Sequence, residues 1–90
     1  MVEIRVAEIK NELGLHARAA AKFVQIATQY QAEVTVEKDG EEVNGKSILS
    51  LMMLAAPICS EITIKTDGDD AAELMEMLLQ LIDDKFGEGK

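Results

Sequence analysis

One stretch of the sequence decides the fold of this chain: Glu33-Val34-Thr35-Val36-Glu37-Lys38-Asp39-Gly40-Glu41-Glu42-Val43-Asn44. Val34 and Val36 alternate with polar residues, as in a strand with one buried face. Asp39-Gly40 is a strong hairpin turn pair, and Val43 lies on the short returning strand. The stretch therefore predicts two antiparallel strands, 33–38 and 41–44, joined by a tight turn.

The segments on either side of this hairpin predict two further strands and three helices. Alternation predicts a half-buried strand from Val2 to Val6, and another over 61–66 with Ile62 and Ile64 inward. Helical spacing of apolar residues predicts helices from Ala17 to about residue 30 and from about residue 70 to 86, and Ser47 caps a short helix reaching about residue 55. The order of elements favours an α+β fold, an antiparallel sheet with helices on one face.

Composition and charge limit the classes of function. The chain has 90 residues and a net charge of −8, so it repels nucleic acid and anionic membranes. The single cysteine, Cys59, excludes an internal disulfide and gives no metal-ligand set, and we expect no cofactor. No apolar run approaches the ~20 residues of a membrane span. We expect one cytoplasmic domain over 1–90, monomeric, with residues 87–90 as a flexible tail.

The candidate site surrounds the only histidine, in Leu13-Gly14-Leu15-His16-Ala17-Arg18. Gly14 allows a tight turn, and good helix formers follow His16. His16 is therefore expected at a helix N-terminus, where unpaired N–H groups and the helix dipole favour an anion. Arg18 adds a planar donor fork. This combination is typical of a place where an imidazole carries a phosphoryl group.

Two motifs in this order of elements resemble the HPr family, the histidine-containing phosphocarriers of the phosphoenolpyruvate-dependent sugar phosphotransferase system. Gly14-Leu15-His16-Ala17-Arg18 is similar to the family's phosphorylation site. Asn44-Gly45-Lys46-Ser47-Ile48, followed by Leu51-Met52-Met53-Leu54-Ala55, is similar to its regulatory serine region. The ending Lys85-Phe86-Gly87-Glu88 also matches. The resemblance covers about Val2 to Glu88.

The resemblance implies an open-faced β-sandwich in which three helices cover a four-stranded antiparallel sheet of order 1-4-2-3. It implies that His16 takes a phosphoryl group from phospho-enzyme I on Nδ1 and passes it to the A domain of a sugar permease. Such a carrier acts stoichiometrically and is not an enzyme. Arg18 matches the active-site arginine, and the backbone N–H groups of Ala17 and Arg18 are candidate phosphate donors. Partner docking is expected at Ala21, Leu49 and Met52.

Ser47 matches the serine that a dedicated kinase phosphorylates in some bacteria, so a serine kinase/phosphorylase and a transcription regulator are further expected partners. Two departures from the family pattern bear on partner choice. Ala19 stands where proline is usual, and Ala56-Pro57-Ile58-Cys59 replaces a glycine-containing loop expected near the histidine. Two alternatives stay open: a regulatory paralogue, of the nitrogen-related branch or a co-regulator, that acts by binding proteins, and a small interaction module without phosphate chemistry.

Overall fold

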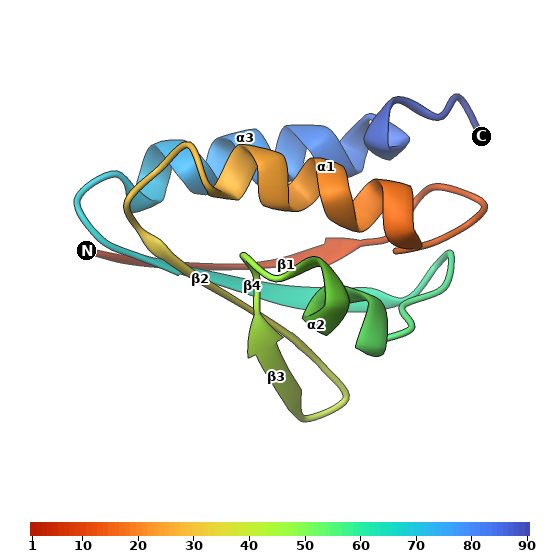
Figure 1. The fold of residues 1–90 in the computed structure, drawn as a ribbon, viewed down its shortest axis with the longest axis horizontal. Coiled ribbons are helices and arrows are strands. Elements are labelled where there is room, and N and C mark those ends of the chain that lie inside the picture. Colours follow the sequence, from red (N-terminus) through yellow and green to blue (C-terminus); the bar gives the residue numbers. More distant parts are fainter.

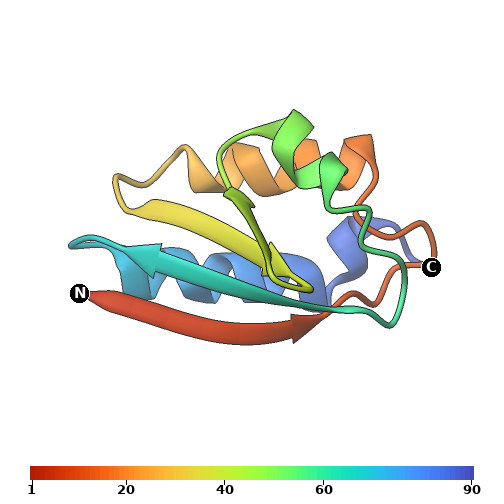
Figure 2. The ribbon, with the colours of Figure 1, turned by 90° about the horizontal axis from the view of Figure 1, so that it is seen from below.

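Four strands form one antiparallel sheet in the order β1-β4-β2-β3, in a computed structural model that describes all 90 residues. The strands are β1 (Val2–Glu8), β2 (Glu33–Lys38), β3 (Glu41–Asn44) and β4 (Glu61–Asp67). The helices are α1 (Ala17–Ala27), α2 (Ile48–Met53) and α3 (Ala71–Asp83), followed by the 3-10 turn η1 (Lys85–Gly87). Figure 1 shows α1 and α3 side by side over the sheet, and Figure 2 shows them behind the strands. The predicted fold class, sheet order and three helices are confirmed.

The hairpin between β2 and β3 forms at the predicted turn. Asp39 and Gly40 have φ angles of 53° and 85°. Two successive positive φ angles are the geometry that matches the twist of paired strands, and Asp-Gly adopts it readily. The turn sets the register in which Val36 pairs with Val43.

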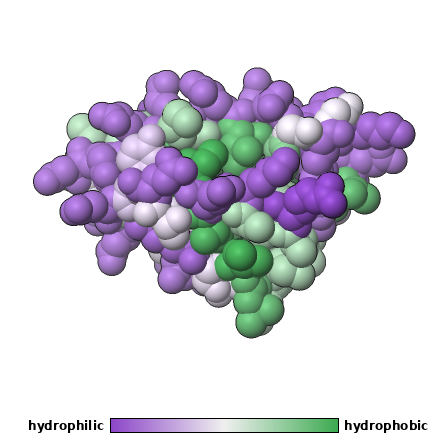
Figure 3. Space-filling model, turned by 45° about the horizontal axis from the view of Figure 1, so that its top comes forward, coloured by the Kyte–Doolittle hydropathy of each residue, from purple (hydrophilic) through white to green (hydrophobic).

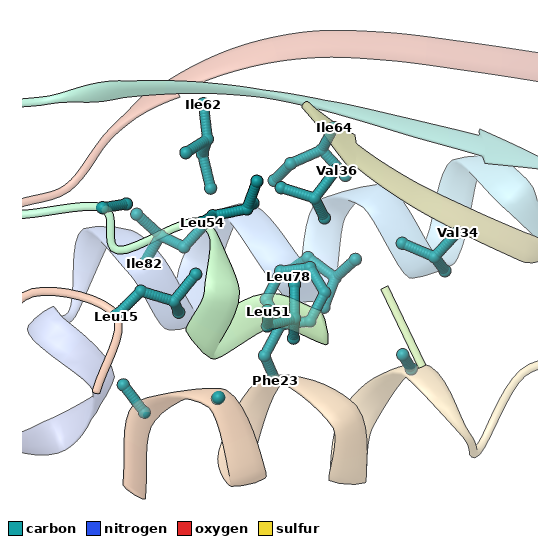
Figure 4. Packing of buried hydrophobic residues seen from close by; sticks show 14 of the residues in the cluster. Leu15, Phe23, Val34, Val36, Leu51, Leu54, Ile62, Ile64, Leu78 and Ile82 are labelled. Carbon is teal, nitrogen blue, oxygen red and sulfur yellow. The ribbon is translucent and has the colours of Figure 1, made fainter. Parts of the chain in front are cut away.

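The core lies between the sheet and the helices, and each helix contributes one apolar face. Phe23 of α1, Leu51 of α2 and Leu78 of α3 are almost completely buried against Val36 and Ile64 of the sheet. Figure 4 shows these side chains meeting beneath the strands. Because only three residues of the chain are aromatic, mainly aliphatic packing holds α1 and α2 in place beside each other. No helix is both long and apolar enough to cross a bilayer.

Strand β1 directs its apolar residues away from the helices. The alternation in the sequence does not predict which face of the strand is buried. Val2, Ile4 and Val6 are 50–60% exposed, on the face of the sheet opposite the helices, so the expectation of a half-buried apolar face is wrong here. The reason is the pairing with β4, in which Arg5 stands opposite the buried Ile64. Directly opposed residues share one face of a sheet, which turns the odd-numbered residues toward the helices.

The last helix ends earlier than predicted. Lys85 and Phe86 both have φ of 56°, a left-handed conformation that cannot continue an α-helix, so α3 ends at Asp83. Phe86 is nevertheless buried, and Lys22 Nζ donates to its carbonyl oxygen at 2.6 Å. This arrangement directs the C-terminal residues back toward the start of α1, as Figures 1 and 2 both show.

Candidate functional site

The loop before α1 is fixed by backbone contacts to the segment that follows α2. Gly14 has φ of +70°, and a Cβ built on it would lie 2.4 Å from the Ala56 carbonyl oxygen. That same oxygen accepts a hydrogen bond from Leu15 N at 2.9 Å. The predicted proximity of the 56–59 loop to the histidine is therefore seen, and a glycine is needed for the close approach.

His16 is the N-cap residue of α1, as predicted. Its backbone is extended, with φ −81° and ψ −178°, and its carbonyl oxygen accepts from Ala20 N at 2.8 Å. Its side chain makes no capping hydrogen bond, and the N–H groups of Ala17, Arg18 and Ala19 have no acceptor within the chain. The first turn of α1 therefore keeps its amide donors available for an anion.

An open cavity of about 810 Å³ lies at this end of α1. His16, Ala17 and Arg18 all line it, so the structure brings together the residues that the sequence analysis grouped. The remaining lining residues are Glu12, Leu13, Lys22, Gly87, Glu88 and Lys90. Three cationic side chains surround the amide donors, in a chain whose net charge is −8. This is the place where the chain can attract an anion.

A carboxylate from the C-terminal segment contacts the histidine ring. Glu88 Oε2 lies within hydrogen-bond reach of His16 Nε2, and Glu88 Oε1 accepts from Asn11 Nδ2 at 3.0 Å. The side chains of His16 and Glu88 are 28% and 12% exposed. Lys90 O also accepts from Glu12 N at 2.8 Å. Residues 87–90, for which the sequence predicts a flexible tail, thus contact the histidine loop at three points.

The contact with Glu88 determines which nitrogen of the His16 ring carries no proton. Burial alone raises the pKa of the Glu88 carboxyl, but hydrogen bonds from Asn11 and His16 and the charges of His16 and Lys22 together hold that pKa below its ordinary value. An ionised carboxylate can only accept, so Nε2 of His16 carries the proton. In the neutral ring Nδ1 then keeps its lone pair and is the nucleophilic atom.

The sequence analysis did not identify Asn11, Lys22 or Glu88 as residues of this site, nor the further lining residues Glu12, Leu13, Gly87 and Lys90. Asn11 is completely buried and donates to Gly14 O at 2.7 Å as well as to Glu88, while its Oδ1 has no partner. A polar residue in a loop sequence gives no sign that it is buried. Lys22 lies on α1, and its Nζ donates to Phe86 O in the C-terminal segment.

The other predicted site residues lie outside the cavity. Ser47 is the N-cap of α2, and its Oγ accepts from Ser50 N at 3.2 Å. On α2, Leu49 is 69% and Met52 40% exposed, and Figure 3 shows hydrophobic residues over this helix against a largely hydrophilic surface. Ala21 is half-buried on α1, which packs against α2.

Acidic pH should remove the contribution of Glu88 to stability. Because its pKa is lower in the folded chain than the ordinary 4.5, its contribution is complete above that pH and is lost as the pH falls through the lowered value. We expect the difference in melting temperature between the natural chain and Glu88→Gln to shrink as the pH falls below 4.5. The measurement is thermal unfolding as a function of pH.

Glu12→Gln is the matched control for this prediction, because Glu12 lines the same cavity and its side chain has no hydrogen bond or ion pair. Its melting temperature should follow that of the natural chain at every pH. A stability difference for Glu88→Gln that stays constant across the acidic range would contradict the role assigned to the carboxylate.

Fold and site together define a class of protein. It is a small open-faced α+β domain whose only histidine caps a helix with free amide donors, beside three cationic side chains. The model of the PTS HPr component phosphorylation site matches residues 4–84. A phosphocarrier protein HPr of Neisseria meningitidis is 55% identical over 83 residues, which are 92% of this chain and 93% of that protein.

Two further comparisons agree. The HPr-like protein Crh of Halalkalibacterium halodurans is 49% identical over 92% of this chain and 98% of its own length. The crystal structure of HPr-C-His from Thermoanaerobacter tengcongensis superposes with a TM-score of 0.92 at 43% identity, over 96% of this chain and 97% of that one. The chain belongs to the HPr family, the phosphocarrier proteins of the phosphotransferase system.

Proposed function

We propose that His16 accepts a phosphoryl group from phospho-enzyme I and passes it to the A domain of a sugar permease. The observation that carries this proposal is the contact between Glu88 and His16 Nε2, which leaves Nδ1 as the nucleophile next to free amide donors. The Nδ1 lone pair attacks phosphorus, a new N–P bond forms, and the donor's N–P bond breaks with its electron pair returning to the donor. Nδ1 has no proton to lose in this step.

The surroundings of the ring suit a phosphate that must arrive and leave. The backbone N–H groups of Ala17 and Arg18 are the proposed donors to its oxygens, and the Arg18 guanidinium supplies a bidentate partner. The ring is only part-exposed, yet the cavity is open, so the group stays accessible to the next protein. A single imidazole that is both acceptor and donor makes the chain a stoichiometric carrier and not an enzyme with turnover of its own.

We further propose that phosphorylation of Ser47 regulates partner binding. Ser47 precedes Leu49 and Met52, the proposed docking residues of α2, by less than one and by about one and a half helical turns, and Ala21 lies on the neighbouring helix. A phosphate would replace the hydroxyl that accepts from Ser50 N and add ~2 negative charges beside this apolar surface. It would repel an acidic partner. A serine kinase/phosphorylase and a transcription regulator are the partners that this proposal adds.

The test is phosphorylation of the natural chain by a bacterial enzyme I and phosphoenolpyruvate, with the modified residue identified by mass spectrometry. Acid-labile phosphate on His16, followed by transfer to a permease A domain, is the expected result. Labelling of Ser47 by a serine kinase with none of His16 by enzyme I would favour the regulatory paralogue. No labelling at either residue would favour the interaction module without phosphate chemistry.

Replacement of Arg18 by alanine should slow transfer about tenfold without lowering stability. Loss of one exposed charge-assisted partner of the phosphate corresponds to about 1.4 kcal/mol in the barrier. Because a cation opposes the dipole at a helix N-terminus, its removal leaves α1 as stable as before or slightly more so. Single-turnover transfer from phospho-enzyme I, together with thermal unfolding, measures both effects. Arg18→Lys keeps the charge but not the planar donor fork of the guanidinium. Its rate of transfer should therefore fall between those of the natural chain and Arg18→Ala.

A further inference from the structure

One face of the sheet is not covered by any helix. The buried residues of β2 and β4 are the even-numbered ones, so the odd-numbered residues of these strands point away from the helices. In β1 the relation is reversed, and Val2, Ile4 and Val6 form an apolar row on the uncovered side, each 50–60% exposed. In Figure 2 this side of β1 and β4 is turned to the viewer, with α3 behind the strands. We refer to it as the open face.

The open face is strongly acidic. Among the residues that the four strands direct to it, Lys65 is the only basic one. The acidic ones are Glu8, Glu33, Glu37, Glu42, Glu61 and Asp67. The whole chain has 9 basic and 17 acidic residues, so negative charge is more concentrated on this face than the composition requires.

These six carboxylates form three pairs that stand directly opposite each other on neighbouring strands. The pairs are Glu8 with Glu61, Glu33 with Asp67, and Glu37 with Glu42. Like charges in this position destabilise a sheet. None of the six takes part in an ion pair, so the fold does not neutralise them itself. A cationic partner would turn this repulsion into attraction.

The apolar row ends at a hollow in the open face. A cavity of about 640 Å³ begins beside Val6, and its lining includes the carboxylates of Glu8, Glu37 and Glu61. The one lysine of the lining is already paired, with Asp39 at 2.8 Å. The face therefore offers an apolar strip and, at the end of that strip, an acidic hollow that can receive a cationic side chain.

We propose that the open face binds a basic amphipathic helix of another protein, lying along β1. A helix is the usual cover of a sheet face. Its apolar side covers Val2, Ile4 and Val6, and its lysine or arginine side chains enter the hollow beside Glu8 and Glu61. Val2 to Glu8 spans ~20 Å, which is the length of about 14 helical residues. Nucleic acid and anionic membranes are repelled by the same charges.

Binding at the open face leaves the phosphoryl site free. The hollow and the histidine cavity have no lining residue in common. The chain can therefore stay attached to such a partner while His16 remains accessible from the other side of the sheet. For the same reason, failure of phosphoryl transfer and failure of this proposal are separate outcomes.

The test is a titration of the full chain with a leucine–lysine peptide of about 14 residues whose leucines lie on one side of a helix. A peptide of the same composition with the leucines spread around the helix is the matched control. We expect NMR shifts of the backbone amides to change at Val2, Ile4 and Glu61, and the control to bind about tenfold more weakly. Shift changes centred on Leu49 and Met52 of α2, or equal binding of the two peptides, would overturn the proposal.

A charge reversal at the hollow should make the fold more stable and the binding weaker. Glu61→Lys converts the repulsive pair with Glu8 into an attractive one, so its melting temperature should rise while its affinity for the peptide falls about tenfold. Glu12→Lys makes the same charge change at an exposed position outside the open face. It should neither raise the melting temperature nor change the affinity by more than about twofold. Equal affinities of these two variants would contradict the assignment of the hollow.

The apolar row is tested by Ile4→Thr, which keeps a β-branched side chain in the strand but removes most of the apolar contact. This variant should also bind the peptide more weakly than the natural chain. Met77→Gln, at a 40% exposed apolar position on α3, is the matched control and should bind normally. Circular dichroism shows that each variant is folded. An Ile4→Thr chain with the affinity of the natural chain would show that charge alone attracts the peptide, and the proposed docking of a helix along β1 would be wrong.

Discussion

A His16→Ala chain is expected to accept no phosphoryl group from phospho-enzyme I, with transfer reduced at least a thousandfold, as for the loss of a nucleophile that forms a covalent intermediate. The reason lies in the cavity, where the other ionisable side chains are carboxylates, ammonium groups and one guanidinium. Protonated amines and guanidinium have no free lone pair at neutral pH. The lysine and arginine side chains of the cavity can therefore not replace the imidazole.

The fold should survive this substitution, which makes the result interpretable. His16 caps α1 through its backbone, and its side chain makes no capping bond. The ring's one hydrogen bond is with the Glu88 carboxylate. The melting temperature should therefore fall only slightly, by an amount similar to that for Glu88→Gln. Full labelling of His16→Ala under conditions that label the natural chain would place the acceptor at another residue.

His16→Gln is a sharper control than alanine. A glutamine amide can donate to Glu88 much as Nε2–H does, but it has no nucleophilic nitrogen. This variant should keep the contact with Glu88 and the order of the C-terminal segment, yet accept no phosphate. The comparison separates the chemistry of the imidazole from its part in holding residues 87–90 in place.

Local rules of the sequence predict those parts of the fold that depend only on neighbouring residues. Asp39-Gly40 predicts its hairpin because a turn with two positive φ angles is set by the two residues themselves. The start of α1 at Ala17 and the cap of α2 at Ser47 are local in the same sense. His16, Ala17 and Arg18 are near in sequence, so their meeting in one cavity was predictable too.

Contacts between distant segments were not predictable in this way. Alternation shows that the two faces of β1 differ, but its pairing with β4 decides which face turns to the helices. The partner of the His16 ring comes from 72 residues further along the chain. It reaches the ring only because Lys85 and Phe86 adopt left-handed conformations that end the helix, and neither residue type favours that conformation.

Replacement of Gly14 by alanine should cost the folded chain about 2–4 kcal/mol. Part of this is the strain of a Cβ at φ +70°, about 1–2 kcal/mol. The rest comes from the Ala56 carbonyl oxygen, which would lie 2.4 Å from the new carbon and is backbone that cannot rotate away. Relief of the clash requires the two loops to separate, which breaks the bond from Leu15 N to that oxygen. For a domain of this size the melting temperature should fall by about 10–20 °C.

Gly40→Ala separates the two causes, because Gly40 has φ of +85° and nothing lies within 4 Å of a Cβ built there. It should show the backbone strain alone, about 1–2 kcal/mol, and leave phosphoryl transfer unchanged since it lies in the β2–β3 turn. Gly14→Ala should in addition slow transfer, because a displaced loop moves His16 relative to the amides of Ala17 and Arg18. Denaturant unfolding and single-turnover transfer measure the two effects. Equal destabilisation by the two substitutions would show that the contact with Ala56 does not hold the histidine loop in place.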